Sequence, residues 1–532
     1  MIKELMLGNE AIARGAYEAN VWVATGYPGT PSSEIIETIG EKYPDISSEW
    51  SVNEKVALEI AIGSSIAGVR SICTMKHVGL NVAADPLMTL SYTGVTGGLV
   101  IVVADDPGMH SSQNEQDTRN YAKFARIPAL EPGDSGEAKE FTALAFDISE
   151  KFDTPVILRT LTRVAHTKTP VDIKKETRKL PPMNEGKNAQ KYVMIPANAR
   201  PSHTKVLERY KKLREYSENF EHHLEEVRGA DIGIITHGFV YNYVREALPD
   251  ASVFKVAMYP IPVKKIKEFA KKVKKLYVIE ELDPLIEEEL RAEGIVLTGK
   301  EIIPSEGELS IDIIRKAFGL PGGEAAPYAG LPARPPQLCK GCGHIQVFEA
   351  LRDLKCTVLG DIGCYTLGVL PPYSAMHTTI CMGASIGSEI GFKKASRLHQ
   401  TLSNSVAVIG DSTFFHSGMT GLLNAVYNRT PITLIILDNR ITAMTGHQPS
   451  PDTGFDNAFQ PNERADMEQV VKGLGVRRVR KIKISPRTVD EFKSAVQEEL
   501  AANEPSVIIA DEICIISEPK MRKLAELIKI GT

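Results

Sequence analysis

Two apolar runs in the last third of the chain each end in a polar residue that could bind a ligand. One run, 406–409, leads into Asp411, and the next, 432–437, leads into Asn439, with a helix-like segment, 416–428, between them. This order predicts a strand, a helix and a strand, which is one βαβ unit. Since ligands bind at the carboxyl ends of the strands in an open α/β sheet, we expect Asp411 and Asn439 at a ligand site.

These residue types suit a diphosphate that is held through a metal ion. Asp411 offers a carboxylate and Asn439 a carbonyl oxygen, and both are hard ligands for Mg²⁺, which bridges to phosphate oxygens. Gly410 has no Cβ, so backbone can approach a phosphate closely there. The following helix would point free N–H groups at the same place. The alternative is an ordinary buried βαβ unit with an aspartate at a turn.

A second candidate region lies in the first third of the chain. Glu54 begins an Ala- and Ile-rich segment that we expect to be a fully buried helix. Taken alone, a carboxylate at a helix N-terminus is usually only a favourable contact with the helix dipole. The Gly- and Pro-rich loop 25–34 is either a substrate contact or a plain connection. The long polar loop 105–119 is either the wall of a site or an exposed excursion.

Composition bounds the class of protein. The 532 residues suggest about three domains, and 43% hydrophobic with 24% charged residues is typical of a soluble globular protein. A net charge of -5 argues against a nucleic-acid binder. No apolar run is long enough to span a membrane, and no signal peptide is present, so we expect a cytoplasmic protein without a membrane partner. The 7 cysteines are too few for a disulfide framework, which leaves reduced thiols or metal ligands.

Alternating strand-like and helix-like segments predict an α/β fold with doubly wound parallel sheets in its first and last domains and a smaller α/β domain between them. The polar, lysine-rich region before the middle domain predicts a linker with an exposed helix over 204–227. The expected boundaries are 1–170 for the first domain, 171–228 for the linker with its helix, 229–320 for the middle domain, 321–336 for a Pro/Gly linker and 337–532 for the last domain.

Several motifs stand together in an order that resembles a known family. They are Thr25-Gly26-Tyr27-Pro28-Gly29-Thr30-Pro31-Ser32, Asn53-Glu54, Leu338-Cys339-Lys340-Gly341-Cys342, Gly360-Asp361-Ile362-Gly363-Cys364-Tyr365, the Gly410-Asp411-Ser412 and Asp438-Asn439 pair, and Ala443-Met444-Thr445-Gly446-His447-Gln448. The pair resembles the thiamine diphosphate signature, Gly-Asp-Gly followed by Asn-Asn, with one residue changed in each half. The whole set resembles the large (alpha) subunits of the indolepyruvate type within the thiamine-dependent 2-oxoacid:ferredoxin oxidoreductases.

The resemblance implies a pyrimidine-binding domain, a transketolase-C-like domain and a diphosphate-binding domain. It also implies oxidative decarboxylation of a 2-oxoacid, an aryl pyruvate such as indolepyruvate, to acyl-CoA and CO₂, with electrons passed to an external ferredoxin. The implied cofactors are thiamine diphosphate and Mg²⁺, with coenzyme A as co-substrate. The implied assembly is a homodimer of this large subunit within a heterotetramer that includes a small second (beta) subunit.

The resemblance also assigns roles to residues. Glu54 would share a proton with the aminopyrimidine ring of the cofactor, Thr30 would touch the substrate, and Arg119 and His110 are further substrate candidates. The Mg²⁺ ligands would be Asp411, Asn439 and the backbone carbonyl of Ile441. The implied cofactor contacts are Gly29, Glu54, Gly363, Cys364, Tyr365, Gly410, Asp411, Ser412, Thr413, Asn439, Thr442, Ala443 and Met444.

Four cysteines match the order of those that hold a 4Fe-4S cluster near thiamine in related enzymes: Cys339, Cys342, Cys364 and Cys514. Thiolates are the ligands that such clusters need. The alternative is that the first two form a local turn and the other two are buried small hydrophobic residues. We expect the remaining three, Cys73, Cys356 and Cys381, in the core.

Large subunits of the family commonly continue into a ferredoxin-like domain with Cys-x-x-Cys repeats, whereas this sequence reaches Thr532 after a basic amphipathic stretch, 519–530. We therefore expect electrons not to leave this polypeptide through such a domain. Two other functions stay open: a non-redox thiamine-dependent decarboxylase, lyase or synthase, and a non-catalytic scaffold subunit.

Overall fold

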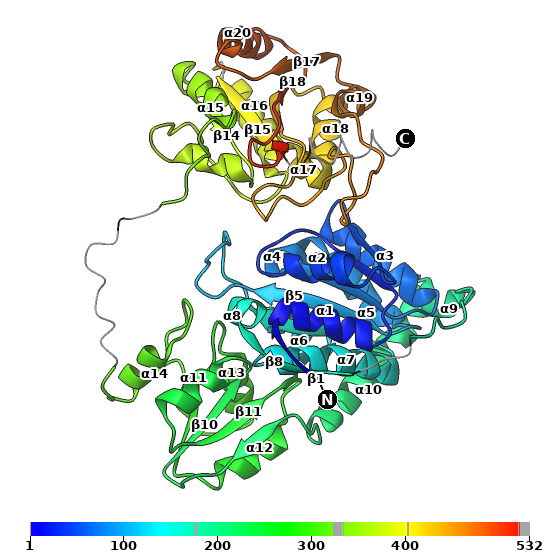
Figure 1. Cartoon of the computed structure of the whole chain (residues 1–532), viewed down its shortest axis with the longest axis vertical. Helices are drawn as coiled ribbons and strands as arrows, with labels where there is room; N and C mark the ends of the chain where they lie inside the picture. Colours follow the sequence, from blue (N-terminus) through cyan, green and yellow to red (C-terminus); the bar gives the residue numbers. More distant parts are fainter. Residues whose placement is uncertain are drawn as a thin grey trace. The chain divides into compact units, whose positions relative to one another are not determined.

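The computed structural model describes residues 2–174, 178–322, 335–401 and 404–519 together with residues 332 and 521, and the chain divides into two compact units, Met1–Pro327 and Tyr328–Thr532 (Figure 1). The expected linker 321–336 and the basic stretch 519–530 lie mostly outside the described residues. Among the helices of the described residues, none is both long enough and apolar enough to cross a membrane.

A seven-stranded sheet organises the first unit, with strand order β12-β6-β7-β5-β4-β2-β3. Every neighbouring pair is parallel except β12 with β6. The strands are β2 (Val23–Gly26), β3 (Ser47–Trp50), β4 (Ser71–Lys76), β5 (Leu99–Asp105), β6 (Ala129–Leu130), β7 (Val156–Leu161) and β12 (Met258–Tyr259). A separate antiparallel pair joins β1 (Ile2–Leu7) to β8 (Lys168–Ile173).

Helices cover both faces of this sheet (Figure 1). Along β4, Ile72 packs into the core cluster on one face, while Cys73 and Met75 pack into the cluster on the other face. Because both faces are covered, the strands read as nearly continuous apolar runs. The helices are α1 (Gly8–Glu18), α2 (Ser33–Lys42), α3 (Glu54–Ile66), α4 (His77–Val82), α5 (Ala84–Thr93), α6 (Arg119–Ala125), α7 (Ser135–Phe152) and α8 (Thr162–His166).

Helix α3 begins at Glu54, as the sequence predicted, but it is not fully buried in this chain. Ala57 and Leu58 are buried against the sheet, whereas Lys55 and Glu59 are exposed. The prediction of full burial was wrong because the charged residues fall on one side of the helix, which gives it one apolar face.

A four-stranded sheet forms the second half of the first unit, with strand order β13-β10-β11-β9, in which β9 is antiparallel. The predicted helix over 204–227 lies earlier, at 196–217, and the end of that range forms the edge strand β9. The elements are α9 (Ala189–Tyr192), α10 (Pro196–Ser217), β9 (Leu224–Glu226), β10 (Ile232–His237), α11 (Val240–Ala247), β11 (Ser252–Val256), α12 (Val263–Ala270), β13 (Lys275–Val278), α13 (Leu285–Ala292) and α14 (Ile311–Ala317).

Between β11 and β12 the chain passes directly from one sheet of the first unit to the other. The apolar run 254–259 reads as a single strand, but the structure breaks it between β11 and β12, which belong to different sheets. Met258 and Tyr259 pair with Leu130 and Ala129 of β6. One core cluster also contains residues of both halves, which is why 1–327 form one compact unit; the boundary between two domains inside it stays a prediction.

The second unit is built on a five-stranded, all-parallel sheet with strand order β14-β15-β16-β18-β17. Its strands are β14 (Thr357–Leu359), β15 (Ser405–Gly410), β16 (Thr433–Asp438), β17 (Arg478–Lys483) and β18 (Ser506–Asp511). Its helices are α15 (His344–Asp353), the 3₁₀-helix η1 (Cys364–Val369), α16 (Ala384–Leu398), α17 (Asp411–Thr413), the π-helix η2 (Phe414–Gly418), α18 (Met419–Tyr427), α19 (Met467–Gly473) and α20 (Val489–Leu500).

The predicted βαβ unit is present in this sheet. Val406 and Val408 of β15 pack into one core cluster, and Ala407 and Ile409 pack into the cluster on the opposite face. The intervening helix begins directly at Asp411 rather than at 416, and it includes a π-helical turn. The predicted α/β fold class with parallel sheets is confirmed.

Candidate active site

Asp411 and Asn439 meet at the carboxyl ends of the neighbouring strands β15 and β16. The Asp411 Oδ2 atom accepts hydrogen bonds from the N–H groups of Asn439 (2.9 Å) and Arg440 (2.5 Å), and its Oδ1 atom accepts one from Ser412 N–H (2.7 Å). The Asn439 Oδ1 atom accepts from Ile441 N–H (3.1 Å). The structure therefore brings the three expected metal ligands, Asp411, Asn439 and Ile441, to one sheet edge.

Several of the expected cofactor contacts lie around the same edge. Ser412 accepts a hydrogen bond from the Thr442 hydroxyl (2.8 Å), and the Thr413 hydroxyl donates to Ile362 O (3.1 Å). Gly410 lies against the buried ring of Tyr365, since a Cβ at Gly410 would stand 2.7 Å from the ring carbon Cε1. Gly410 therefore cannot carry a side chain without moving the ring. Gly363 and Cys364 open η1 beside this tyrosine, and Ala443 and Met444 follow Thr442 in the next loop.

Two further buried carboxylates accompany Asp411: Asp438, which the sequence placed at the strand end without a role, and Asp452, which the sequence analysis did not single out. Ligand atoms of Asp411, Asp438 and Asp452 all lie within 4.8 Å of one another. Burial, together with the neighbouring carboxylates, raises the pKa of Asp411 and of Asp438, and burial raises the pKa of Asp452. Neither oxygen of Asp438 has a hydrogen-bond donor among the described residues. A buried carboxylate that accepts no hydrogen bond needs a cation or a proton beside it. The carboxylate oxygens gathered here are therefore ligands that fit Mg²⁺.

The four candidate cysteines line one cavity of about 250 Å³ in the second unit. Cys339 and Cys342 precede α15, Cys364 begins η1, and Cys514 follows β18. Asn439 lines the same cavity. All four side chains are free thiols. Sulfur donors from three segments around one cavity are a donor set that fits an iron–sulfur cluster.

Polar groups around this cavity give the thiols different acidities. Burial and the Glu512 carboxylate raise the pKa of Cys342 to about 12, and burial raises the pKa of Cys364 to about 11. Burial also raises the pKa of Cys514, but hydrogen bonds from His447 and the backbone outweigh it and lower that pKa to about 7. Outside the cavity, Cys73 and Cys356 are buried as expected, whereas the expectation for Cys381 was wrong, because it lies exposed just before α16.

Glu54 lies in the first unit, at the amino end of α3. The Asn53 side chain caps this helix by accepting a hydrogen bond from Val56 N–H (2.9 Å). The buried Glu54 carboxyl group packs against Gly79 of α4, where an added Cβ would lie 2.5 Å from Glu54 Oε1. The missing side chain of Gly79 therefore leaves the space that the Glu54 carboxyl group occupies.

The loop with Gly29 and Thr30 follows β2 and lies beside the end of β4. A Cβ at Gly29 would stand 3.1 Å from Lys76 Cβ, and the Ser111 hydroxyl donates to Thr30 O (3.3 Å). Thr30 itself is half-buried. The ends of β2 and β4 and the start of the 105–119 loop thus come together. Lys76 is a residue that sequence reasoning missed, although its place at a strand end is a signal that could have found it.

The two other substrate candidates have different surroundings. The His110 ring is 52% exposed, and its Nε2 atom lies 3.3 Å from Glu308 Oε2. Arg119 is buried, and its guanidinium contacts Asp117 (2.5 Å) and Glu280 (2.8 Å). Because carboxylates already occupy the guanidinium, Arg119 does not fit the role of a substrate contact, and we correct that assignment to a structural ion pair.

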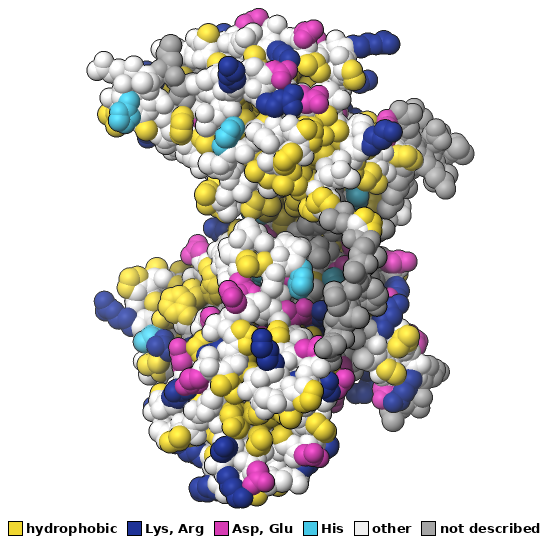
Figure 2. All heavy atoms as spheres, turned by 90° about the vertical axis from the view of Figure 1, so that its left-hand side faces the viewer, with side chains coloured by type: hydrophobic (Ala, Val, Ile, Leu, Met, Phe, Trp, Pro, Cys, Tyr) yellow, Lys and Arg dark blue, Asp and Glu magenta, His cyan; other side chains and the backbone are white. Residues whose placement is uncertain are grey.

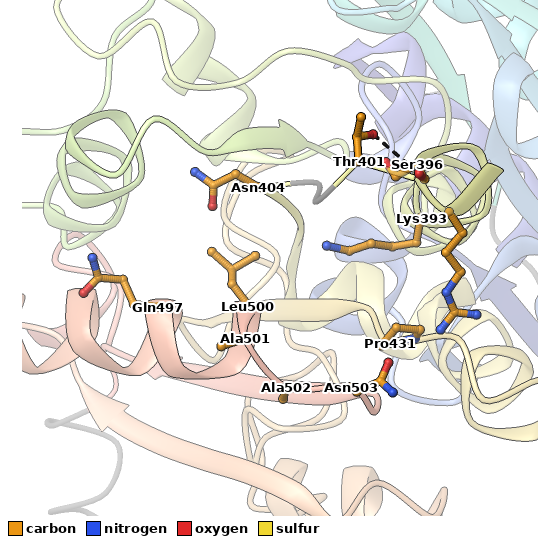
Figure 3. Close-up of a pocket in the computed structure, with 11 residues that line it drawn as sticks. Lys393, Ser396, Thr401, Asn404, Pro431, Gln497, Leu500, Ala501, Ala502 and Asn503 are labelled. Atoms are coloured by element: carbon orange, nitrogen blue, oxygen red, sulfur yellow. Dashed lines mark hydrogen bonds between the residues drawn. The ribbon is translucent and has the colours of Figure 1, made fainter. Parts of the chain in front are cut away.

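The second unit also has a cavity of about 740 Å³ that holds none of the expected site residues (Figure 3). It is lined from α16 by Lys393 and Ser396 and from the end of α20 by Leu500. Asn404 and Pro431, which precede β15 and β16, also line this cavity. It therefore lies at the amino ends of the strands. The chemistry-bearing residues lie at the opposite, carboxyl ends.

Comparisons with known proteins show the family to which the chain belongs. A family model described as "Pyruvate flavodoxin/ferredoxin oxidoreductase, thiamine diP-bdg" matches residues 14–231, and one described as "Thiamine pyrophosphate enzyme, C-terminal TPP binding domain" matches residues 361–510. An Archaeoglobus fulgidus protein named "Indolepyruvate oxidoreductase subunit IorA" is 40% identical over 98% of this chain and 88% of its own length. The chain belongs to the IorA family of indolepyruvate oxidoreductase subunits.

Other relatives extend this result. A Pyrococcus abyssi protein of the same name is 41% identical over 96% of this chain and 86% of its own length. The solved structure titled "2-oxoglutarate:ferredoxin oxidoreductase from Magnetococcus marinus with 2-oxoglutarate, coenzyme A and succinyl-CoA bound" covers 60% of this chain and 65% of that chain, with 19% identity and a TM-score of 0.51, and it supports the fold. The chain is thus a subunit of a thiamine-diphosphate-dependent 2-oxoacid oxidoreductase.

Proposed function

We propose that this chain is the thiamine-binding large subunit of an enzyme that oxidatively decarboxylates an aryl 2-oxoacid, such as indolepyruvate. The products are CO₂ and the acyl-CoA thioester, and the two electrons pass to ferredoxin. The name shared by relatives about 40% identical over nearly the whole chain supports the choice of substrate. The arrangement of four cysteines around one cavity with Asn439 is the observation that favours electron transfer.

The residues at the β15 and β16 edge would hold the diphosphate end of the cofactor. Asp411, Asn439 and the carbonyl of Ile441 would bind Mg²⁺ through oxygen, while the missing Cβ of Gly410 leaves room for the ring of Tyr365 beside this edge. The N–H groups of Asn439 and Arg440 donate hydrogen bonds to the Asp411 carboxylate and so restrict its orientation. Asp438 and Asp452 add negative charge that favours a cation at this edge.

Glu54 would hold the proton that the aminopyrimidine ring exchanges. It is buried at a helix start and fixed against Gly79, so its position is defined before the cofactor binds. Thiamine diphosphate, when bound, supplies the electron sink into which the carbon–carboxylate bond breaks. Thr30 and His110 stay proposed substrate contacts, since both lie on loops at the carboxyl ends of strands of the same unit.

Cys339, Cys342, Cys364 and Cys514 would ligate one 4Fe-4S cluster, and the cluster, when bound, would supply an acceptor for single electrons. Thiolates are needed for this, and the hydrogen bond from His447 already favours the thiolate at Cys514. The same cavity wall carries Asn439, so a metal ligand of the diphosphate edge and the four cysteines share one region of the unit.

We further propose coenzyme A as the acyl acceptor, a small second subunit as the partner, and pairing of two copies of this chain. Relatives are named as subunits, which supports a partner. Large apolar side chains remain exposed in the second unit, among them Leu398 (85%) and Tyr427 (83%). Figure 2 shows hydrophobic side chains gathered over one area of this unit, as expected for a surface that another chain covers.

The test is anaerobic purification of the chain with its partner subunit, followed by quantification of thiamine, magnesium, iron and sulfide and a screen of 2-oxoacids. We expect four irons and four sulfides for the four cysteines and CoA-dependent reduction of ferredoxin, fastest with aryl pyruvates. The variant Cys342→Ser should lose iron while it keeps thiamine. Protein without iron that releases an aldehyde instead of a thioester would contradict the proposal and support a non-redox lyase.

A further inference from the structure

Lys76 is unusual among the buried lysines of the described residues. Four lysines are buried there, and three of them contact a carboxylate: Lys139 with Glu18 (2.7 Å), Lys255 with Glu137 (2.6 Å) and Lys393 with Glu389 (3.4 Å). Lys76 is 7% exposed, and the ion pairs of the described residues do not include it: the hydrogen bonds of its Nζ atom go to Ser111. A buried cation is costly unless an anion pairs with it.

The known contacts of the Lys76 ammonium group come from one residue. Its Nζ atom donates to the backbone oxygen of Ser111 (2.7 Å) and to the Ser111 hydroxyl (3.3 Å). Both acceptors are neutral, and they lie on the same residue, whereas an ammonium group has three donors. Lys76 therefore keeps both a donor and an unbalanced positive charge for a further partner.

Asp106 holds Ser111 in place without touching the lysine. Its Oδ2 atom accepts hydrogen bonds from Ser111 N–H (2.9 Å) and from the Ser112 hydroxyl (2.5 Å), and its Oδ1 atom accepts from the Thr162 hydroxyl (2.9 Å). The carboxylate of Asp106 is thus engaged by other donors. Burial lowers the pKa of Lys76 to about 8, and the more distant charge of Asp106 only partly opposes this.

The position of Lys76 places its ammonium group among the proposed active-site residues of the first unit. Lys76 ends β4 and precedes α4, and the first turn of α4 carries Gly79, which contacts the Glu54 carboxyl group. The Gly29 and Thr30 loop lies over the lysine stem, and Ser111 bridges the ammonium group to Thr30 O. A cation at this place faces the residues that would receive the cofactor ring and the substrate.

We propose that Lys76 binds the carboxylate of the 2-oxoacid substrate through a direct ion pair. This inference rests on the proposed function, because it assigns the recognition of the acid group at that same site. The Lys76 ammonium group lacks a negatively charged partner, and the carboxylate of a 2-oxoacid would supply that negative charge. Ser111 fixes the ammonium group before the substrate arrives. Arg119 does not fit this role because its guanidinium is already paired with Asp117 and Glu280.

The test uses the assembled, thiamine-loaded enzyme and two unreactive probes of the same shape, 3-phenylpropionate and its uncharged amide. Binding of each probe is measured by calorimetry for wild type, Lys76→Met and Lys76→Arg. The matched control is Lys255→Met, which removes another buried lysine at a distance from these residues in the chain and in the sheet order. Thiamine affinity and near-UV circular dichroism report whether each variant is folded.

Wild type and Lys255→Met should bind the carboxylate about tenfold to a hundredfold more tightly than the amide, since the free energy of a hydrogen bond to a charged group corresponds to this ratio of affinities. Lys76→Met should lose that preference, and Lys76→Arg should keep part of it. The KM for an aryl pyruvate should rise by a similar factor in Lys76→Met, with a smaller change in kcat.

A carboxylate preference that survives in Lys76→Met, or that is lacking in wild type, would overturn the inference. If Lys76→Met does not fold, loss of the preference in a folded Lys76→Arg variant would overturn it as well. Failure of the proposed function is a separate result, namely wild-type enzyme that binds the carboxylate but releases no CO₂ from any 2-oxoacid.

Discussion

At the scale of single residues, backbone hydrogen bonds hold Asp411 at the carboxyl end of β15, next to the end of β16. Asp411 receives three backbone N–H groups, so its orientation is fixed by the fold itself. The place of Asp411 and Asn439 at strand ends could be predicted from the sequence because each follows an apolar run after one intervening residue. Asp452 could not, because it arrives on a loop with no periodicity, and only the folded chain brings it within reach of Asp411.

Asp411→Ala should lower the affinity for thiamine diphosphate in the presence of Mg²⁺ by about tenfold to a hundredfold. The change removes a proposed metal ligand and leaves the N–H groups of Asn439 and Arg440 without their acceptor. Calorimetric titration of the cofactor measures the effect, and Asp490→Ala, an exposed aspartate in the first turn of α20, is the control. Equal affinity in Asp411→Ala and wild type would remove Asp411 from the metal site.

At the scale of elements, α3 and α4 act together because Gly79 of α4 packs against the Glu54 carboxyl group at the start of α3. The sequence predicted that α3 starts at Glu54 but not this contact, because a glycine inside a helix-like segment gives no information about its neighbour. The split of 254–259 between two sheets could not be predicted either, since the run contains no glycine or proline that would mark a break between two strands.

Gly79→Ala should reduce turnover by at least tenfold while thiamine still binds. The added Cβ would stand 2.5 Å from Glu54 Oε1, so the carboxyl group must move, and misplacement of a proton-transfer group lowers the rate. Gly63→Ala in α3 is the control, because nothing lies within 4 Å of its added Cβ and alanine favours a helix. Steady-state kinetics of both variants decide, and equal turnover in the two would mean that Gly79 does not position Glu54.

Arg119 of α6 joins the two halves of the first unit through its contacts with Asp117 and Glu280. Arg119→Met should lower the free energy of unfolding by about 3–5 kcal/mol, since it leaves buried carboxylates without a partner. Urea unfolding measures this, with Lys123→Met on the same helix as a control that should cost about 1 kcal/mol or less, because Lys123 is 45% exposed. A stable Arg119→Met variant with a raised KM would instead return Arg119 to the substrate site.

At the scale of the whole molecule, the chain consists of two units, each with its own sheets and core clusters. On the face drawn in Figure 2, basic and acidic side chains are mixed over the described surface. The sequence predicted the α/β class well because parallel strands buried on both faces leave strong apolar runs. That the four cysteines gather around one cavity could be seen only in the folded chain. The order of the cysteines in the sequence left open both a cluster site and a local turn with buried small residues.

The stability of the first unit should depend on pH through Glu281. Burial raises the pKa of this carboxyl group to about 7, although it accepts a hydrogen bond from Leu309 N–H (2.8 Å). Because the folded chain holds the Glu281 proton more tightly than the unfolded chain does, the protonated carboxyl group contributes to stability. This contribution is complete below the unfolded pKa, near 4.5, and is lost as the pH rises through about 7.

Relative to Glu281→Gln, the free energy of unfolding of the wild type should therefore fall by about 3 kcal/mol between pH 4.5 and pH 8. Urea unfolding of both proteins across this range measures the difference. Parallel pH profiles would show that Glu281 does not retain its proton in the folded chain.

The most direct test of the account is the rate at which the thiazolium C2 proton of bound thiamine diphosphate exchanges with deuterium, measured by NMR after acid quench. We expect the Glu54→Gln variant to bind the cofactor but to exchange this proton about a hundredfold to ten-thousandfold more slowly than wild type. The variant of an exposed residue on the same helix, Glu59→Gln, should exchange it as fast as wild type. Exchange at the wild-type rate in Glu54→Gln would show that this carboxyl group does not act on the cofactor, and the account would be wrong.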